Sequence, residues 1–584
     1  MSYEILFRQA IEHHQNGEFD QAQQIYRQIL ETLPSHPDIL NLLGLIAQAK
    51  NIHQEAINLF YQAIQADHKR AQFYFNLGIS LHLWNKPYEA LEAFEKSAQL
   101  DNSIKETWLE IGNIRQELNS IPEAQTAYNK ALEIDKHYVE AHIKQISLNS
   151  NTQEAIQQLI ELQQHYPNNP QIDFELGLLY FKQQDLINAL PHATKATMHL
   201  PFNGDAHSLL GQILLSNNNI TEAQKAFINT LEITPNNMPA LINLGNIEVQ
   251  NKNYTLAEIY YRRAIELDSA NFDAHHNYAT MLHQQNRLSE ALEEYRKAII
   301  INPKRAEACN NLGLILREQK EFEDALGLFF NAFTLNSNLE EISINISETL
   351  ILYFTEEPQT ALDIAKNWHQ QYPNNIFAQH TLASLQGINQ AENQEYSKKL
   401  FDNFAPSYEA TLLELDYQIP SKIAQILGNI SGNILDLGCG TGLTGKAIKN
   451  NNNTLYGVDI SSNMLKLAKQ KNIYHELSNQ DIVNYLKDNK TKFDYIISAD
   501  VFCYFSDLEP IISNCNSTPL CFSIETTQET EKYQISNTGR YKHSPLYIKQ
   551  LLNKYNYTQI VEYPLTLRNE NNQPVLGIIF VAKP

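Results

Sequence analysis

The sequence of 584 residues predicts an all-α superhelix of helical hairpins, followed by an α/β doubly wound domain. Small residues recur every 34 positions through most of the first 385 residues, which is typical of stacked helical repeats. Beyond residue 386 this period disappears, and short apolar runs alternate with helical stretches, as in a sheet covered by helices. We therefore expect a repeat array over 1–385, a linking segment over 386–420 and an α/β domain over 421–584.

Several positions of the repeat hold the same residue types together. In one unit a small residue lies at Gly44, an alanine follows at Ala56 and an aromatic residue at Phe60. Small residues let two antiparallel helices approach closely, and prolines such as Pro34 end the second helix. The pattern predicts eleven units, of which the fifth and the eleventh depart in length. They begin near residues 3, 37, 71, 105, 139, 170, 204, 238, 272, 306 and 340.

The repeat resembles the tetratricopeptide repeat in its length and in its paired small and aromatic positions. Arrays of this kind stack their hairpins into one continuous core and offer a concave surface to other molecules. The resemblance implies that the array binds a protein or a peptide.

An asparagine recurs at one position of the first helix, at Asn243, Asn277, Asn311 and Asn345, and earlier at Asn76. A side-chain amide can donate to and accept from a peptide backbone at once. Stacked repeats of this kind step by about 8–10 Å, which is about the length of three residues of extended polypeptide. This ladder resembles the inner face of the repeat superhelix in O-linked N-acetylglucosamine transferases, which implies that these five residues bind an extended polypeptide. The alternative is that the chain is rich in asparagine and the position tolerates polar residues.

The α/β domain contains seven apolar runs that are predicted to be strands. A polar turn joins the last two, which we expect to form a hairpin at one edge of the sheet. The runs are 433–438, 454–460, a weaker 474–479, 493–500, 520–526, 558–568 and 575–583.

A glycine-rich turn follows the first predicted strand. Its glycines let the backbone approach a ligand, and Asp436 before them can hold a polar or cationic tail. Asp459 ends the second strand, where a carboxylate can take both ribose hydroxyls, and Asp481 follows the third, where an adenine amine would lie. The glycines alone also fit a nicotinamide dinucleotide site, but such a site explains only one of these acids.

The segments ILDLGCGTGLTG, GVDISSNML and FDYIISADVFCYFSDL resemble class I methyltransferases. Together with the repeats and FDNFAPSYEATL, they look like bacterial methyltransferases that carry N-terminal tetratricopeptide repeats, a family of mostly undefined substrate. The resemblance implies S-adenosyl-L-methionine as the cofactor and places an N-terminal lid, with Phe401, Phe404 and Tyr408, over it. The positions that it assigns to the cofactor are Tyr408, Asp436, Gly438, Gly440, Gly442, Asp459, Ile460, Met464, Asp481 and Ile482.

Methyl transfer also needs a group that removes a proton from the acceptor. Asp500 is the first candidate because it ends the fourth predicted strand, although it could instead cap the following turn. Tyr541 and His543 come next, since GRYKHSP precedes a predicted helix and could bend over the pocket; a surface histidine at a helix start is the alternative. Cys503 lacks the context of a nucleophile and is expected to pack in the core.

The net charge is −22, and residues 393–584 contribute little to it, with 18 Lys and Arg against 19 Asp and Glu. An acidic array repels phosphate backbones, so we expect no nucleic-acid partner. The five cysteines show no metal-ligand spacing, and no apolar run is long enough to cross a membrane. We expect a cytoplasmic protein without a metal or a membrane anchor.

Three classes of function remain open from the sequence. The chain can be a methyltransferase whose repeats recruit a protein substrate, or a small-molecule methyltransferase whose repeats dock it in a complex. The third class is a repeat scaffold with an inactive cofactor domain. The presence of all three acids, Asp436, Asp459 and Asp481, argues against the scaffold.

Overall fold

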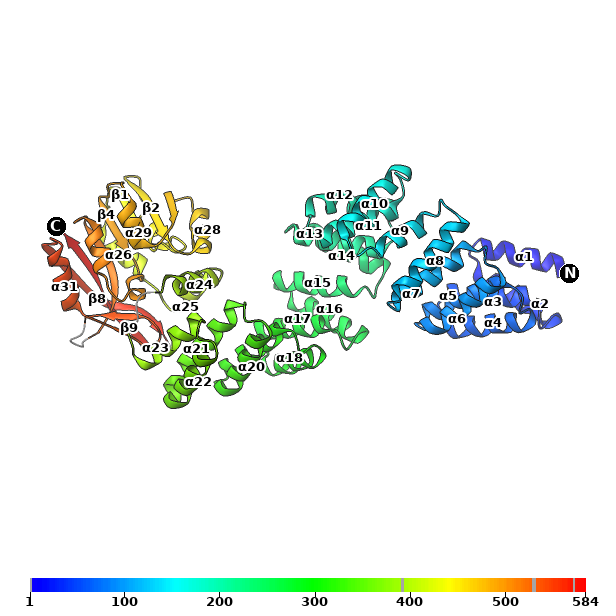
Figure 1. Ribbon diagram of the computed structural model, residues 1–584, viewed down its shortest axis with the longest axis horizontal. Helices are drawn as coiled ribbons and strands as arrows, with labels where there is room; N and C mark the ends of the chain where they lie inside the picture. Colours follow the sequence, from blue (N-terminus) through cyan, green and yellow to red (C-terminus); the bar gives the residue numbers. More distant parts are fainter. Residues whose placement is uncertain (1–2, 390–392, 528–531, 571–572) are drawn as a thin grey trace. The chain divides into compact units, whose positions relative to one another are not determined.

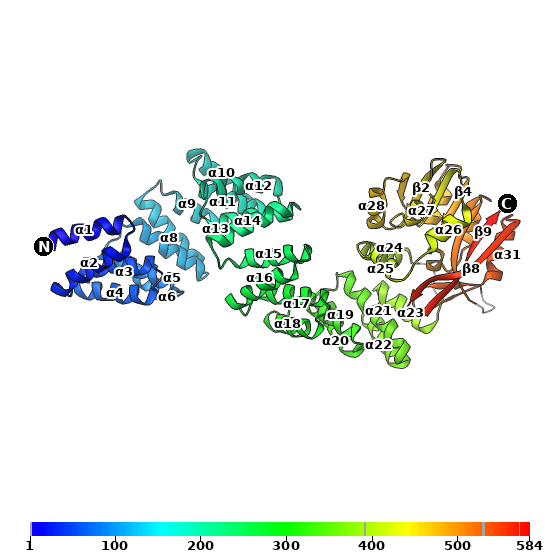
Figure 2. The same cartoon turned by 180° about the vertical axis from the view of Figure 1, so that it is seen from behind.

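A computed structural model of the chain describes residues 3–389, 393–527, 532–570 and 573–584 (Figure 1; Figure 2 shows the reverse side). The chain divides into two compact units, Met1–Leu267 and Asp268–Pro584. The first unit contains helical hairpins alone, and the second contains the last hairpins together with the α/β domain. The predicted fold class is confirmed.

Within the described residues, the first unit consists of eight helical hairpins whose first helices begin where the 34-residue period predicts. The fifth hairpin explains the shortened step, because its first helix has 9 residues where its predecessor has 13. The helices are α1 (Tyr3–Gln15), α2 (Phe19–Thr32), α3 (Pro37–Ala49), α4 (His53–Ala66), α5 (Ala71–Leu83), α6 (Pro87–Leu100), α7 (Lys105–Glu117), α8 (Ile121–Ile134), α9 (Val139–Ser147), α10 (Thr152–His165), α11 (Pro170–Lys182), α12 (Leu186–His199), α13 (Gly204–Ser216), α14 (Ile220–Ile233), α15 (Met238–Gln250) and α16 (Tyr254–Leu267).

The second unit begins with three further hairpins and one additional helix. The last hairpin has a long first helix of 17 residues. The additional helix packs on the last hairpin and is capped at its C-terminus by Gly387, whose positive φ of 67° suits glycine. The helices are α17 (Phe272–Gln284), α18 (Leu288–Ile301), α19 (Ala306–Glu318), α20 (Phe322–Leu335), α21 (Glu340–Glu356), α22 (Pro358–Gln371) and α23 (Ile376–Gln386).

The recurring glycine lets an aromatic ring enter the hairpin. A Cβ added at Gly313 of α19 would lie 2.8 Å from Cε1 of Phe329 on α20, closer than real Cβ atoms come to a neighbour. Phe329 is completely buried there. The same pairing occurs at Gly78 and Phe94 in the first unit. In the units that contain this pair, the sixteen-residue spacing therefore follows from two helices packing around one buried ring.

We predict opposite effects for two glycine-to-alanine substitutions in the tenth hairpin. Gly313→Ala should lower the free energy of unfolding by about 1–3 kcal/mol, because the methyl group overpacks against Phe329. Gly327→Ala should raise it by up to about 1 kcal/mol, because Gly327 is exposed on α20 with open space around it and alanine favours the helix. Denaturant unfolding of both variants checks the pair, and equal effects would contradict this packing.

The α/β domain is built on a mixed sheet. Strands β3, β2, β1, β4 and β5 are parallel and neighbour one another in that order, β9 pairs antiparallel with β5, and β8 pairs with β9. The two last predicted strands thus form the expected hairpin. The bounds are β1 (Gly432–Leu437), β2 (Asn453–Asp459), β3 (Tyr474–Asn479), β4 (Tyr495–Ser498), β5 (Leu520–Thr526), β8 (Gln559–Glu570) and β9 (Gln573–Lys583).

Helices connect and cover the strands. The first of them, α24, contacts both the repeat helices α21 and α23 and the domain helix α28. Buried apolar residues of β1, β4 and β5 form the core beneath the helices, with Leu435 and Phe522 fully buried. The helices are α24 (Gln394–Phe404), α25 (Tyr408–Glu414), α26 (Ile419–Leu427), α27 (Leu443–Ile448), α28 (Ser462–Gln470), α29 (Ile482–Asp488), α30 (Glu509–Ile512) and α31 (Pro545–Lys554).

Two short strands were not predicted. β6 (Tyr533–Ile535) and β7 (Tyr541–His543) form an antiparallel hairpin, and β7 continues the sheet where Glu525 of β5 pairs with Lys542. Strands of three residues are too short to show the alternation of apolar and polar residues that identifies a strand.

Candidate active site

A pocket lies at the carboxyl ends of the parallel strands. The strand order reverses between β1 and β4, which is where open α/β sheets bind ligands. The pocket gathers most of the residues predicted for the site from distant parts of the sequence; their role in binding stays a prediction. Those that line it are Tyr408, Gly438, Gly440, Asp459, Ile460, Met464, Asp481, Ile482 and Asp500, together with Ser397, Phe401, Ala499, Val501, Tyr504 and Phe505.

The glycine-rich turn follows β1 and brings the backbone to the pocket. Gly438 has a positive φ of 65°, and a Cβ there would lie 2.5 Å from Cγ2 of Val501. The backbone N–H of Gly440 donates to Oδ2 of Asp459 at 2.8 Å. The amide of Gly440 is thus already bonded to a carboxylate and is not available to bind a phosphate.

Asp459 ends β2 and is a buried carboxylate at the wall of the pocket. Its Oδ1 accepts a hydrogen bond of 2.8 Å from the N–H of Ser461, and 8% of the residue is exposed. Burial raises the pKa of Asp459 to about 6, although the hydrogen bonds from Ser461 and Gly440 oppose this shift. A ligand that donates hydrogen bonds or carries positive charge would therefore stabilise the ionised form.

Asp436 and Gly442 are not among the residues that line the pocket, and their contact with a ligand stays a prediction. Asp436 is buried behind the turn, where its Oδ2 accepts a hydrogen bond of 2.6 Å from the hydroxyl of Tyr474. Burial raises the pKa of Asp436 to about 7, against the effect of that bond. A Cβ at Gly442 would lie 2.9 Å from Cε2 of the same tyrosine. Both residues support the turn from behind.

The charges around the pocket are negative. Asp459, Asp481 and Asp500 line it, and no Lys, Arg or His is among the described residues that do so. Carboxylates in a partly buried cleft attract a cationic ligand and repel a phosphate. This charge pattern favours a positively charged ligand over a dinucleotide.

Helix α24 covers the pocket and connects it with the repeats. Asp402 of α24 accepts a hydrogen bond of 2.7 Å from the Ser461 hydroxyl, beside the strand end that carries Asp459. On its other side, Tyr396 of α24 stacks on His380 of α23, with ring centroids 3.9 Å apart. Phe401 packs against Tyr504 at a centroid distance of 5.0 Å. The predicted lid therefore lies between the last repeat helices and the α/β domain.

Asp500 lies directly after β4 in a left-handed backbone conformation, with φ of 58°. Such a conformation is uncommon outside glycine and occurs often at functional sites. Its backbone N–H donates to the hydroxyl of Ser523 at 2.7 Å. Nη1 of Arg568 donates to both carboxylate oxygens of Asp500, at 2.9 and 2.7 Å.

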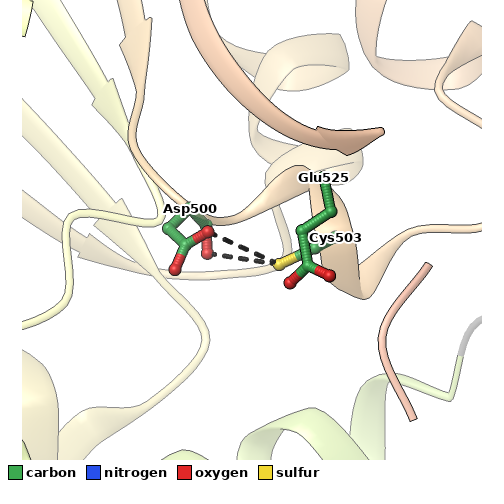
Figure 3. A group of neighbouring side chains, drawn as sticks. All are labelled: Asp500, Cys503 and Glu525. Carbon is green, nitrogen blue, oxygen red and sulfur yellow. Dashed lines mark hydrogen bonds between the residues drawn. The ribbon is translucent and has the colours of Figure 1, made fainter. Parts of the chain in front are cut away.

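Among the described residues, Asp500, Cys503 and Glu525 bring three possible metal ligands within 4.8 Å of one another (Figure 3). Arg568 bonds to both carboxylates of this group and supplies the positive charge that they need. Burial, together with the charge of Asp500, raises the pKa of the Cys503 thiol, whereas a metal requires the thiolate. The group is therefore better described as an ion-paired cluster than as a metal site.

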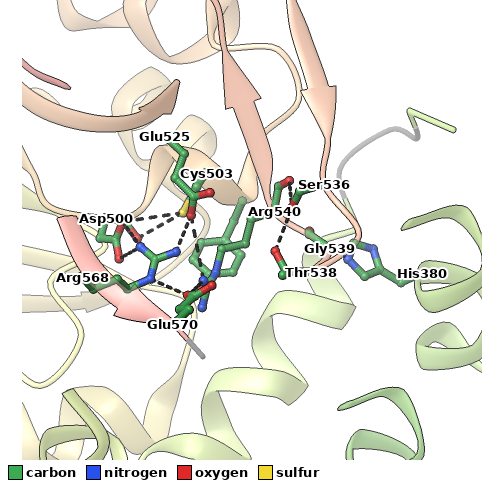
Figure 4. Close-up of polar contacts among 11 residues, drawn as sticks. His380, Asp500, Cys503, Glu525, Ser536, Thr538, Gly539, Arg540, Arg568 and Glu570 are labelled. Carbon is green, nitrogen blue, oxygen red and sulfur yellow. Dashed lines mark hydrogen bonds and ion pairs between the residues drawn. The ribbon is translucent and has the colours of Figure 1, made fainter. Parts of the chain in front are cut away.

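The cluster extends across the domain to β8 and to the β6–β7 turn (Figure 4). Arg568, 2% exposed, bonds through Nε to Oε1 of Glu570 at 2.6 Å, and Glu570 also pairs with Arg540. Burial opposes ionisation of Glu570, but the two arginines outweigh it and lower its pKa to about 2. None of these four side chains, Glu525, Arg540, Arg568 and Glu570, was predicted from the sequence.

Tyr541 and His543 do not reach the pocket, which corrects the expectation that GRYKHSP bends over it. Both residues are buried in β7, at 3% and 0% exposure. Nε2 of His543 lies 3.3 Å from the carbonyl oxygen of Ser506, and burial lowers the pKa of this histidine to about 4. Pairing of β7 with β5 holds the segment in the sheet. Arg540 of the same segment was not predicted as a site residue, although it forms an ion pair with Glu570 of the cluster.

The asparagine ladder is not an open row of amides. Asn76 and Asn345 are each 6% exposed and donate at 2.9 Å to Oδ1 of Asn41 and Asn310, on the preceding first helix. This burial corrects the expectation that these two amides face a bound peptide. The remaining three are half-buried and also have contacts inside the protein. Peptide binding by Asn243, Asn277 and Asn311 stays a prediction.

Comparison with protein families agrees with this architecture. Residues 435–518 match a family model described as a methyltransferase domain. Models described as tetratricopeptide repeats match residues 7–72, 105–138, 208–272, 260–293 and 279–320.

Curated relatives match about a quarter of this chain. An uncharacterized methyltransferase of Anoxybacillus flavithermus is 27% identical over 148 residues, which is 25% of this chain and 56% of that protein. A ubiquinone biosynthesis O-methyltransferase of Coxiella burnetii is 29% identical over 139 residues, which is 23% of this chain and 58% of that protein. The chain thus spans little more than half the length of the curated relatives that it matches.

The similarity to solved structures is low. The crystal structure of the APC/C hetero-tetramer Cut9-Hcn1 covers 66% of this chain and 96% of its own, with 13% identity and a TM-score of 0.35. Yeast Tom70 covers 62% of this chain and 98% of its own, with 14% identity and a TM-score of 0.32. In the described part of the chain, no helix has the length and apolarity needed to span a membrane. The family matches and the fold together show that this chain joins tetratricopeptide repeats to a methyltransferase domain.

Proposed function

We propose that the domain transfers methyl groups from S-adenosylmethionine, and that the repeats bind a protein that is either its substrate or its partner. The observation that carries this proposal is the charge of the pocket. Three carboxylates line it, of which only Asp500 is paired with an arginine, and no cationic side chain is among the described residues that line it. The Gly440 amide is already bonded to Asp459. A positively charged sulfonium compound suits these surroundings, whereas a nicotinamide dinucleotide would bring its pyrophosphate against them.

The residues around the pocket fit this cofactor. Asp459 would hold the ribose hydroxyls, because its buried carboxylate has lone pairs left beside the two backbone bonds. Ile460, Met464 and Ile482 provide apolar walls for a purine, and Asp481 lies beside them for its amine. When bound, the cofactor supplies an electrophilic methyl group on a sulfonium, which an acceptor atom attacks while the sulfur keeps the electron pair of the broken bond.

Asp500 is the proposed proton acceptor, because it alone of the three sequence candidates lines the pocket. Arg568 fixes the orientation of its carboxylate through two hydrogen bonds. Each oxygen keeps a lone pair for a further hydrogen bond. Its role is to hold, and then to take, the proton of an acceptor that enters beside it.

The identity of the acceptor separates two versions of this function. The repeats support a protein partner, because tetratricopeptide arrays stack into protein-binding surfaces. The resemblance to an O-methyltransferase of a small compound supports the second version, in which the repeats dock the enzyme and do not select its substrate.

The affinity for S-adenosylmethionine should depend on pH through Asp459. The pKa of Asp459 is raised to about 6, and only its ionised form accepts two hydrogen bonds from a ribose. We expect a constant dissociation constant above about pH 7 and a rise approaching about tenfold per pH unit well below pH 6. Calorimetric titration of the full chain between pH 5 and 8 measures this, with Asp459→Ala as the control that should lose the dependence. A flat profile in the unmodified protein would reject the role of Asp459.

Methyl transfer itself is tested by adding the full chain and methyl-labelled S-adenosylmethionine to a cell extract. Label in protein supports recruitment of a polypeptide substrate by the repeats, and label in the small-molecule fraction supports the second version. Asp459→Ala is the matched control, with S-adenosylmethionine kept at a concentration that this variant binds poorly. Labelling no higher than in this control, in both fractions, would contradict the proposed function.

A further inference from the structure

A second cleft adjoins the cofactor pocket inside the second unit, with a volume of about 550 Å³. The two share Phe401 and Tyr504 in their walls. These rings pack against each other at a centroid distance of 5.0 Å, so an occupant of the cleft reaches the pocket only when they separate. The volume of the cleft is within the size range of sites that bind small organic molecules, and it is larger than a single side chain requires. An acceptor of that size could therefore lie in the cleft, next to the pocket.

The repeats and the α/β domain supply opposite walls of the cleft. Ile344 and Ile351 of α21 and Phe377 of α23 line the repeat side, and Thr538 and Arg540 of the β6–β7 turn line the other. Figure 4 shows this turn beside His380 of α23. Nε2 of His380 lies 3.1 Å from the carbonyl oxygen of Gly539, which fixes the two walls to each other. The last repeat is therefore part of the cleft and not only a neighbour of the domain.

The charged residues of the cleft already have partners within the described residues. Nη1 of Arg317 donates to Oε2 of Glu348 at 2.8 Å, and Arg540 pairs with Glu570. Glu341 accepts a hydrogen bond of 3.3 Å from Asn310. An anionic occupant would lose water without gaining an unpaired positive charge, which is costly. The cleft thus favours an uncharged molecule over an anion.

Aromatic and polar groups at the junction indicate what the molecule carries. Five rings line the cleft, on Phe377, Tyr396, Phe401, Phe404 and Tyr504. The hydroxyl oxygen of Tyr504 accepts a hydrogen bond of 3.3 Å from Nε of Arg540. Burial, opposed by Arg540, raises the pKa of Tyr504 to about 12, so its hydroxyl keeps a proton that it can donate. An oxygen atom with lone pairs is the natural recipient of that bond.

We propose that this cleft binds the methyl acceptor, and that the acceptor is an uncharged, ring-bearing small molecule with a hydroxyl group, held in part by the last repeat. The proposal rests on the proposed methyl transfer, since it takes the neighbouring pocket as the cofactor site. Tyr504 positions the acceptor oxygen, and Ile344 and Ile351 determine which rings fit.

The test is calorimetric titration of the full chain with 2-naphthol as the probe. Ile351→Glu should weaken 2-naphthol binding by about tenfold or more, because it places an unpaired charge in the wall. Ile300→Glu is the matched control, since Ile300 is 81% exposed on α18 and outside the cleft; it should bind 2-naphthol like the unmodified protein. Thr538→Glu serves as a second wall variant, because Thr538 is exposed and its substitution leaves the core intact.

Two further probes define the chemistry. Naphthalene-2-carboxylate has the same rings with a charge and should bind more weakly than 2-naphthol. N-acetyltyrosinamide carries the same phenol on a peptide backbone and should bind more weakly, because its two amide groups would lose water against the apolar walls formed by Ile344, Ile351 and Phe377. No binding of 2-naphthol, equal binding by both wall variants, or tighter binding of either other probe would overturn the proposal. S-adenosylmethionine titrated into the same variants should bind normally; failure of that titration in the unmodified protein would instead overturn the proposed function.

Discussion

Arg568→Met is expected to lower the stability of the α/β domain by about 3–5 kcal/mol, because it leaves buried carboxylates without their positive charge. Arg568 is 2% exposed and bonds to Asp500, Glu525 and Glu570. Arg540 would remain near two of these acids, but not at Asp500. Hydrogen exchange of the β8 and β9 amides measures the effect, since it reports the free energy of opening in that part of the sheet.

Lys549→Met is the matched control for this substitution. Lys549 forms a partly exposed ion pair with Glu562 in the same domain, 2.8 Å between Nζ and Oε1. Exposed pairs contribute about 0–1 kcal/mol, so exchange in β8 and β9 should hardly change. If Arg568→Met were as harmless as Lys549→Met, the cluster would not be the ion-paired support of Asp500 that we describe.

Asp459→Ala is expected to weaken S-adenosylmethionine binding by about 10- to 150-fold, corresponding to about 1.5–3 kcal/mol for hydrogen bonds to a charged group. The ribose hydroxyls would lose a carboxylate partner, and the N–H groups of Gly440 and Ser461 would lose their acceptor. Calorimetry on the full chain measures the change. Asp488→Ala removes the same charge from an exposed site at the end of α29 and should leave the affinity unaltered. Unaltered affinity in Asp459→Ala would reject the assignment.

The repeat boundaries could be predicted because the packing that defines them is local in sequence. Gly313 and Phe329 are sixteen residues apart, and the same pair recurs in other units, so the spacing is visible without a structure. The additional helix α23 was missed because it has no partner helix to complete a repeat. The glycine turn and Asp459 could be placed at the pocket for the same reason, since each lies at the end of one strand.

The ion-paired cluster and the cleft depend on contacts between distant segments. Arg568 and Asp500 are 68 positions apart and meet only because β8, β9 and β5 pair in one sheet. No local pattern marks such a contact. The cleft likewise needs Ile351 of a repeat and Arg540 of a short turn that sequence periodicity does not reveal.

The asparagine ladder shows how a periodic pattern can be read in two ways. Asn345 recurs at the ladder position, but its side chain is used to bond Asn310 of the preceding helix. Elsewhere the same residue type caps helices, as Asn237 does for α15 and Asn271 for α17. The sequence period shows that Asn345 shares its helix position with the other ladder residues. Only the structure shows that its buried amide bonds to Asn310 and not to a ligand.

The most direct test of the central claim is a titration of the unmodified full chain with S-adenosylmethionine and, separately, with NAD at pH 7.5. The carboxylate-lined pocket predicts saturable one-to-one binding of S-adenosylmethionine and no measurable binding of NAD. Tight binding of NAD, or no binding of S-adenosylmethionine, would contradict the claim that this pocket serves methyl transfer.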